Sequence, residues 1–124
     1  MPEGGFSFSH KKGQTFVPYN GKIADITHAD TNKHTLTLAN AAGTGAIGGE
    51  TRKVTMVITQ TNRIAGAGSL LLYPNEGTVL VETDLLASAL YPIVIANGTQ
   101  RLQYALTVAG SDFDLYCMGY VVEA

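Results

Sequence analysis

The amino-acid sequence predicts an all-β protein, a single-domain antiparallel β-sandwich that is jelly-roll-like. Apolar residues recur with a period of two or stand in short β-branched runs, and turn residues separate these runs. Helical periodicity is scarce, so a fold of alternating strands and helices is not favoured. A chain of 124 residues is long enough to bury a core without a metal or a disulfide.

Several short segments have the pattern of strands. In the segment at 54–59, Val54, Met56 and Ile58 are expected to share the more buried face, because side chains alternate along a strand. The segment at 84–90 begins with a candidate helix N-cap and stops before a proline, which fits one short helix and equally a bent strand or a loop. The expected strands lie around residues 23–27, 34–38, 54–59, 70–73, 78–82, 93–96, 102–108 and 113–122.

Turn residues predict four hairpins between these strands. Asn97-Gly98 stands between two β-rich runs, and a type I′ turn needs positive φ at both central positions, so residues 93–108 are expected to form one hairpin. Pro74 and Gly77 predict a second hairpin at 73–77. Two more turns are expected at 29–33 and at 110–112, the latter leading into the last strand.

The sequence predicts an extended N-terminal arm at residues 1–20 and a β-sandwich domain at 21–124. The arm is rich in aromatic residues and poor in aliphatic ones. Exposed aromatic side chains favour interfaces, so Phe6, Phe8, Phe16 and Tyr19 are candidates for contact with another subunit. The alternative is that they complete the core of their own chain.

Charge and composition exclude several functions. The net charge is −2 and the eight basic residues are scattered, which argues against a nucleic-acid partner. No long apolar run and no charged leader followed by an apolar stretch is seen, so we expect no membrane segment and no signal peptide. The single cysteine, Cys117, cannot form an intrachain disulfide and is interpreted as a packed thiol.

The glycine spacing of residues 43–48, GTGAIG, matches the dinucleotide-binding fingerprint. The fingerprint requires a helix directly after it, because the pyrophosphate binds the free N–H groups of the first helical turn. Here the β-branched segment 54–59 follows, so no cofactor is predicted. We interpret residues 39–51 as a flexible surface loop without a core role, suited to contact with a partner.

Two groups of residues have side chains that can bind metal ions. His28, Asp30 and His34 surround one predicted turn, but their spacing matches no strong zinc pattern. Asp112 and Asp114 are two residues apart and point the same way in a strand, which suits calcium only with further partners. For both groups a polar turn is the preferred interpretation, and no metal site is assigned.

No catalytic constellation is recognised, and the protein is predicted not to be an enzyme. Ser69 and Ser88 lack the G-x-S-x-G setting of a nucleophile. Four tyrosines near strands are interpreted as core edges and cross-strand pairs, although they could also form a platform for sugars; these are Tyr91, Tyr104, Tyr116 and Tyr120.

The end of the chain, from residue 101 to the terminal run Met118-Gly119-Tyr120-Val121-Val122, resembles the closing strands of small phage virion structural proteins of the capsid decoration and fibre-head type. This resemblance implies a small β-sandwich that binds a capsid lattice or its own copies, often as a trimer. We therefore expect a non-enzymatic structural protein of a virus particle, located in the virion after assembly in the host cytoplasm. A carbohydrate-binding β-sandwich module is the alternative.

Overall fold

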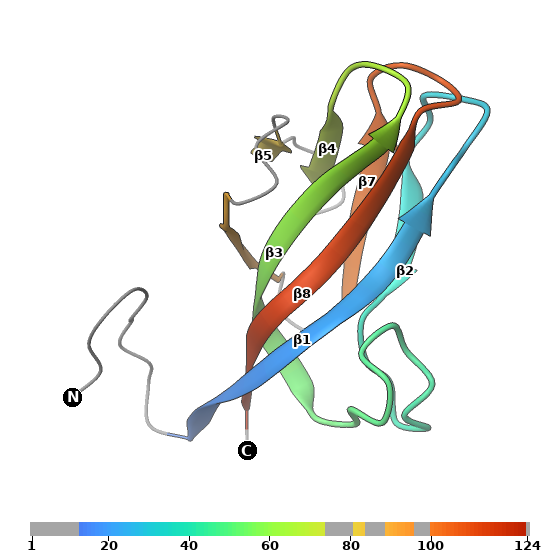
Figure 1. Cartoon of the computed structure of the whole chain (residues 1–124). Coiled ribbons are helices and arrows are strands. Elements are labelled where there is room, and N and C mark those ends of the chain that lie inside the picture. Colours follow the sequence, from blue (N-terminus) through green and yellow to red (C-terminus); the bar gives the residue numbers. More distant parts are fainter. Residues whose placement is uncertain (1–12, 74–80, 84–88, 96–99, 124) are drawn as a thin grey trace.

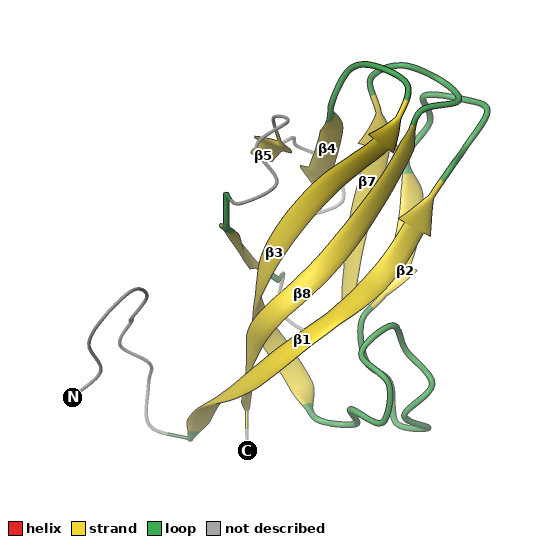
Figure 2. Ribbon diagram, viewed as in Figure 1, coloured by secondary structure: helices red, strands yellow, loops and turns green. Residues whose placement is uncertain are grey.

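The computed structural model describes residues 13–73, 81–83, 89–95 and 100–123 (Figure 1). Within these residues the chain forms strands and loops and no helix, which confirms the all-β prediction (Figure 2). The strands are β1 (Gln14–Ile26), β2 (His34–Thr37), β3 (Lys53–Ala65), β4 (Leu70–Tyr73), β5 (Val81–Thr83), β6 (Tyr91–Val94), β7 (Arg101–Leu106) and β8 (Asp112–Glu123).

The strands form two four-stranded sheets that pack as a sandwich. Sheet A has the order β1-β8-β3-β6 and sheet B has the order β2-β7-β4-β5, with every neighbouring pair antiparallel. The first strand pairs with the eighth, the second with the seventh, the third with the sixth and the fourth with the fifth. A long antiparallel hairpin rolled into two layers gives this order, which is the jelly roll. The predicted jelly-roll-like sandwich is therefore confirmed.

The sandwich has two distinct ends. At the upper end in Figure 1, the β1–β2, β3–β4 and β7–β8 connections come together. The backbone N–H of Gly110 donates to the carbonyl oxygen of His28 at 2.8 Å, and that of Ser69 donates to Oγ1 of Thr107 at 2.8 Å. The lower end holds the β2–β3 connection, the start of β1 and the end of β8.

Three of the four predicted hairpins are wrong. Residues 29–33 connect β1 of sheet A to β2 of sheet B, residues 95–100 connect β6 to β7, and residues 107–111 connect β7 to β8, so each connection crosses between the sheets. Only the hairpin predicted at 73–77 joins neighbours in one sheet, β4 and β5. Its residues 74–77 and the predicted Asn97-Gly98 turn lie outside the described residues.

The predicted face of β3 is also corrected. Val54 lies opposite Val122 and Met56 lies opposite Val121, so Thr55 is an extra residue in a β-bulge. Val54 packs in the core, whereas Met56 and Ile58 lie outside the core cluster, on the outer face of sheet A. The bulge thus reverses which side chains face outward.

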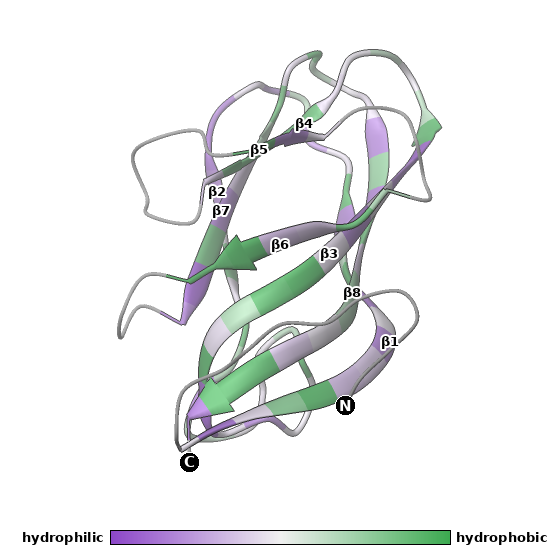
Figure 3. Cartoon of the chain, turned by 90° about the vertical axis from the view of Figure 1, so that its left-hand side faces the viewer, coloured by the Kyte–Doolittle hydropathy of each residue, from purple (hydrophilic) through white to green (hydrophobic). Residues whose placement is uncertain are grey.

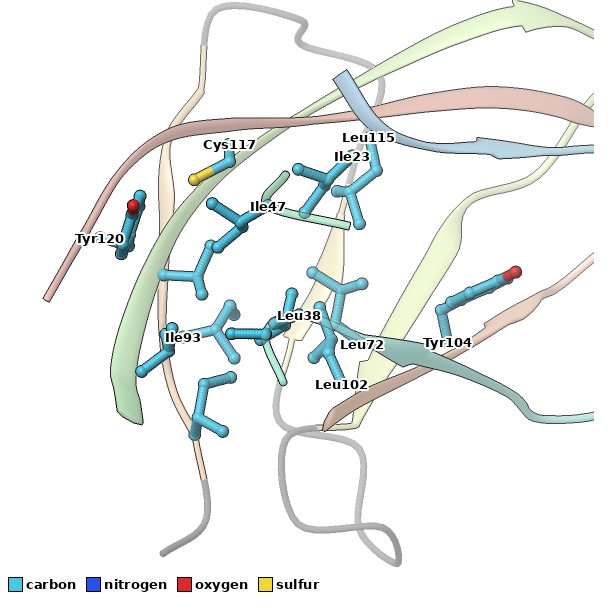
Figure 4. Packing of buried hydrophobic residues seen from close by; sticks show 14 of the residues in the cluster. Ile23, Leu38, Ile47, Leu72, Ile93, Leu102, Tyr104, Leu115, Cys117 and Tyr120 are labelled. Carbon is cyan, nitrogen blue, oxygen red and sulfur yellow. The ribbon is translucent and has the colours of Figure 1, made fainter. Parts of the chain in front are cut away.

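A continuous apolar core fills the space between the sheets (Figure 4). Its largest fully buried side chain is Phe113 on β8, and Leu38 and Ile47 from the β2–β3 connection are buried beside the strands. Each such side chain contributes about 1.5 to 3 kcal/mol when it is removed from water. The core is thus large enough to support the fold without a disulfide, and the single cysteine is free.

The structure places residues 14–20, which the sequence assigned to an extended arm, in β1. They pair with β8 from Gln14 opposite Glu123 to Pro18 opposite Gly119. The described part of the expected arm is therefore an integral edge strand of sheet A. Residues 1–12 lie outside the described residues. So do residues 84–88 of the segment for which one short helix was considered, and its last two residues, Ala89 and Leu90, lie in a loop.

Across the described ranges, no helix is long and apolar enough to cross a membrane.

Candidate functional site

The outer face of sheet A carries two adjacent rows of apolar residues that run across all four strands. In each row every residue lies directly opposite the next one in the strand register. Their sequence neighbours, such as Val17, Val57 and Ile93, pack in or against the core, so the row residues point away from it. We call these rows the apolar face. The first row is Phe16, Val121, Met56 and Val94, and the second is Pro18, Gly119, Ile58 and Pro92.

The apolar face is open to solvent at its flanks. Val94 is 62% exposed, the highest value among the exposed large hydrophobic residues of the described chain, and Pro92 and Pro18 are exposed. In the middle, Ile58 is 2% and Val121 is 3% exposed, although neither belongs to the core cluster. Figure 3 shows hydrophobic stretches of β6, β3, β8 and β1 side by side. The exposed apolar residues of this face therefore lie on its two edge strands, β6 and β1, with buried side chains between them. Apolar side chains left exposed in this way favour contact with another protein.

Prolines restrict how this surface can associate. β1 and β6 are the edge strands of sheet A, and each contains one proline, Pro18 or Pro92. A proline has no N–H group to donate to an added strand, and prolines at sheet edges prevent edge-to-edge pairing. Each edge of sheet A therefore lacks one donor for an added strand.

Towards the upper end, the outer face of sheet A becomes acidic. Asp25, Asp112 and Asp114 each have a carboxylate oxygen within 4.8 Å of the others. Lys22 Nζ lies 3.6 Å from Asp114 Oδ1 and 3.8 Å from Asp25 Oδ2. Among the described residues, the buried Oδ1 of Asp112 has no hydrogen-bond partner.

This acidic cluster agrees with the expectation that Asp112 and Asp114 face the same way, and strand pairing adds Asp25, which lies opposite Asp114. Oxygen ligands of this kind suit calcium. However, Lys22 already places an ammonium group against two of the three carboxylates, which provides the positive charge that a cation would supply. We therefore describe it as an acidic cluster and not as a metal site.

The structure brings His28, Asp30 and His34 together, but not around a common point. The two imidazole rings stack with centroids 3.5 Å apart and an interplanar angle of 7°. His28 Nε2 is 3.0 Å from the hydroxyl of Tyr104, and His34 Nε2 is 2.9 Å from Asp30 Oδ1. The pKa of Asp30 is lowered, first by this hydrogen bond with His34. In parallel stacked rings the nitrogen lone pairs point in parallel planes. The two histidines therefore do not converge on one tetrahedral ion.

The loop that contains GTGAIG is packed against the sandwich, which corrects the prediction of a flexible loop without a core role. Ile47 is fully buried, and its N–H donates to the carbonyl oxygen of Leu38 at 2.9 Å. The N–H of Ala46 donates to the carbonyl oxygen of Thr37 at 2.8 Å. A Cβ added to Gly45 would lie 2.5 Å from the Leu38 carbonyl oxygen, so the chain passes close to its own backbone there. Strand β3 follows the loop, and the helix that the nucleotide fingerprint requires is not formed.

Glu50, which the sequence did not single out, fixes the end of this loop. Glu50 is 5% exposed. Its carboxylate accepts hydrogen bonds from the backbone N–H of Arg52 at 2.7 Å, from Arg52 Nε and Nη2 at 2.9 Å each, and from the Tyr120 hydroxyl at 2.6 Å. The hydrogen bonds from Arg52 are the main reason why the pKa of Glu50 falls to about 2. No motif or spacing in the sequence indicates this network, because Tyr120 is 70 residues away along the chain.

A shallow cavity of about 270 Å³ opens beside this network. Its two cationic side chains are already paired, Arg52 with Glu50 and Lys53 with Glu123, so the cavity offers little free positive charge to an anion. The cavity is lined by Ala39, Asn40, Ala41, Thr51, Arg52, Lys53 and Gln100.

The interpretation of Cys117 and of most tyrosines as core residues is confirmed. Cys117 is fully buried, and burial raises the pKa of its thiol to about 11. Tyr104 and Tyr120 belong to the core cluster and Tyr91 packs against it, whereas Tyr116 alternates with the core residues of β8 and faces outward. The four tyrosines therefore do not form one platform for a sugar.

The interface candidates from the arm separate into three groups. Phe16 lies on the apolar face, and a Cβ at Gly119 would come within 2.6 Å of its ring, so the ring covers that glycine. Tyr19 packs against the core and contacts Tyr120 edge to face, with ring centroids 5.8 Å apart. Phe6 and Phe8 lie outside the described residues.

No family model, no curated protein and no solved structure matches the chain.

Proposed function

We propose that the protein is a non-enzymatic structural protein of a virus particle, a capsid decoration protein or another minor virion protein, that associates with its own copies and binds a protein lattice. The apolar face is the observation that carries this proposal. A monomer that exposes Val94, Pro92 and Pro18 around buried Ile58 and Val121 leaves apolar area in water that a partner would cover.

The jelly-roll architecture is compatible with the same function. Jelly rolls occur in viral capsid proteins, and also in lectins and cupins, so the fold alone does not select one function. Carbohydrate binding, the alternative, has less support, because three of the four candidate tyrosines point into the core. The histidine stack and the packed GTGAIG loop likewise favour structural roles over chemistry.

The oligomeric state tests the association through the apolar face. Light scattering of the full chain over a range of concentrations should give an oligomer, and Val94→Asp should weaken the association at least about tenfold, because a carboxylate would be buried in an apolar contact. Val108→Asp is the matched control, since Val108 is also an exposed valine, 44% exposed, but lies in the β7–β8 connection. A wild-type chain that is monomeric at every concentration would contradict the proposal.

Binding to a lattice is tested separately. Mass spectrometry of purified virus particles from cells that carry the gene should detect the chain as a particle component. Its absence from such particles, while capsid proteins are detected, would refute the assignment to the virion.

A further inference from the structure

We propose that the outer face of sheet A, between the apolar face and the upper end, binds a neutral saccharide. The site is centred on Tyr116, the one candidate tyrosine that neither belongs to the core cluster nor packs against it. This is a second activity of the chain and does not depend on the proposed self-association. We call the site the polar platform. Its first row is Lys22, Tyr116 and Gln60, and its second row is Asp25, Asp114 and Asn62.

Strand pairing builds the polar platform from three strands. The residues of each row lie directly opposite one another on β1, β8 and β3, so each row shares one face of the sheet. On β8, Tyr116 and Asp114 stand on either side of Leu115, which is buried in the core, so both rows point away from the core. Neighbouring strands lie about 4.8 Å apart and alternate residues about 6.7 Å apart, so the platform extends about 10 Å by 7 Å.

Three side chains of the polar platform have unused hydrogen-bonding groups. Tyr116, Gln60 and Asn62 are half-buried, and among the described residues their side chains form no hydrogen bond or ion pair. Each amide has two N–H donors and one carbonyl acceptor, and the phenol hydroxyl can donate and accept. Polar groups that are partly removed from water gain from a partner that satisfies them. These three side chains are therefore available to a ligand.

The charges of the polar platform favour a neutral ligand. Lys22 Nζ lies 3.6 Å from Asp114 Oδ1 and 3.8 Å from Asp25 Oδ2. The two carboxylates repel an anionic ligand, and the ammonium group repels a cationic one. A guanidinium or ammonium group also contains donors only, so it would leave the amide N–H groups without an acceptor. Hydroxyl groups donate and accept, so a ligand rich in hydroxyl groups can satisfy the amides and the carboxylates together.

The aromatic ring of Tyr116 distinguishes a saccharide from other ligands that are rich in hydroxyl groups. A sugar ring carries its hydroxyl groups at the rim and C–H groups on its faces. The face of an aromatic ring is negative and attracts C–H groups, while polar side chains beside the ring fix the orientation of the ligand. Lys22 and Gln60 lie on the two sides of Tyr116 in its row, so such polar side chains are present. One ring with two amides and two carboxylates therefore suits a neutral saccharide.

Nuclear magnetic resonance titrations of the isotope-labelled full chain test this site. The probes are glucose, galactose, mannose and N-acetylglucosamine, each at up to about 10 mM, which detects dissociation constants in the millimolar range. We expect at least one probe to shift the amide signals of the polar platform and to leave those of sheet B unchanged. The anionic N-acetylneuraminic acid and the cationic glucosamine should bind at least about threefold more weakly, because each meets a like charge on the platform.

Variants separate the contributions of the ring and of the amides. Tyr116→Ala should weaken binding about tenfold, whereas Tyr116→Phe, which keeps the ring, should weaken it about two- to fivefold. Gln60→Leu should weaken binding about two- to tenfold, because one hydrogen-bonding group is lost. Gln103→Leu is the matched control and should leave binding unchanged, since Gln103 is also half-buried but lies between core residues of β7 on sheet B. Thermal unfolding of every variant establishes that the sandwich is folded.

The outcomes distinguish this inference from the proposed self-association. The site is refuted when none of the four neutral probes shifts a platform amide, or when Tyr116→Ala binds the probe as strongly as the wild type. Stronger binding of glucosamine or N-acetylneuraminic acid than of every neutral probe would show that the ligand class is wrong. A wild-type chain that is monomeric but binds a neutral probe through Tyr116 would refute the self-association and support this site.

Discussion

Replacing Glu50 by Gln tests whether a single buried carboxylate holds the β2–β3 connection against β8. Each of its two carboxylate oxygens accepts a hydrogen bond from Arg52: Nη2 donates to Oε1, while Nε and the backbone N–H donate to Oε2. In Glu50→Gln one oxygen becomes an NH₂ group. Whichever way the amide turns, that NH₂ faces an N–H of Arg52, so at least one hydrogen bond is replaced by a contact between two donors.

The magnitude follows from the pKa of Glu50. A fall from 4.5 to about 2 means that the folded protein favours the charged carboxylate by about 3 kcal/mol. We expect Glu50→Gln to lower the free energy of unfolding at pH 7 by about 2 to 3 kcal/mol. For a chain of 124 residues this corresponds to a melting temperature lower by about 10 °C.

The pH dependence gives a second test. Because the folded pKa of Glu50 lies below its unfolded value, the stabilisation is complete above about pH 4.5 and is lost as the pH falls through about 2. Urea unfolding of the wild type and of Glu50→Gln at several pH values should therefore show two curves that approach each other in acid. Glu123→Gln is the control, since Glu123 is 46% exposed and its ion pair with Lys53 is expected to contribute less than about 1 kcal/mol.

Two results would refute this reasoning. One is a loss of stability at pH 7 for Glu50→Gln that is no larger than for Glu123→Gln. The other is a difference between the wild type and Glu50→Gln that stays constant from pH 7 to pH 2, because the stabilisation would then not depend on the charge.

Three further predictions concern the packed loop and the core. Ile47→Ala should lower the free energy of unfolding by about 3 kcal/mol in urea titrations, because the side chain is fully buried; a loss below about 1 kcal/mol would show that the loop is not part of the core. Gly45→Ala should destabilise by about 1 to 3 kcal/mol, because its Cβ would meet the backbone of Leu38 at 2.5 Å, whereas Gly48→Ala, with nothing within 4 Å, should be nearly neutral; equal effects on the melting temperatures would contradict the close approach. The fully buried Cys117, with a pKa raised to about 11, should react with a thiol reagent at pH 8 only as fast as the protein unfolds, and rapid labelling without urea would contradict its burial.

The sequence was a good guide to the fold class and a poor guide to its connections. Period-two apolar patterns arise from burial on one side of a strand, which is a local property, and they predicted the sandwich correctly. Turn residues fix only local dihedral angles. The sheet that the next strand joins depends on partners far along the chain. β6 pairs with β3, whereas β7 pairs with β2 and β4. The segment 93–108, which was expected to form a hairpin, therefore crosses between the sheets.

The sequence did not predict the apolar face for a related reason. The run Val54-Thr55-Met56-Val57-Ile58 is apolar on both faces, and one bulge at Thr55 determines that Met56 and Ile58 point outward. A bulge is set by the pairing with β8, which local spacing does not reveal. Likewise, alternation correctly placed Asp112 and Asp114 on one face, but Asp25 joins them only through the pairing of β1 with β8.

The nested strand pairing also has a consequence for how the protein folds. β4 and β5 are the only described sheet neighbours that follow each other in the chain, whereas β1 and β8 must meet across almost its whole length. Closing such long loops costs entropy before any contact stabilises them, so we expect folding in milliseconds to seconds rather than microseconds. β8 is the last of the strands to be synthesised and lies between β1 and β3. Until β8 is made, β1 has no partner in sheet A and β3 can pair only with β6, so a nascent chain exposes unpaired strand edges that are prone to aggregate.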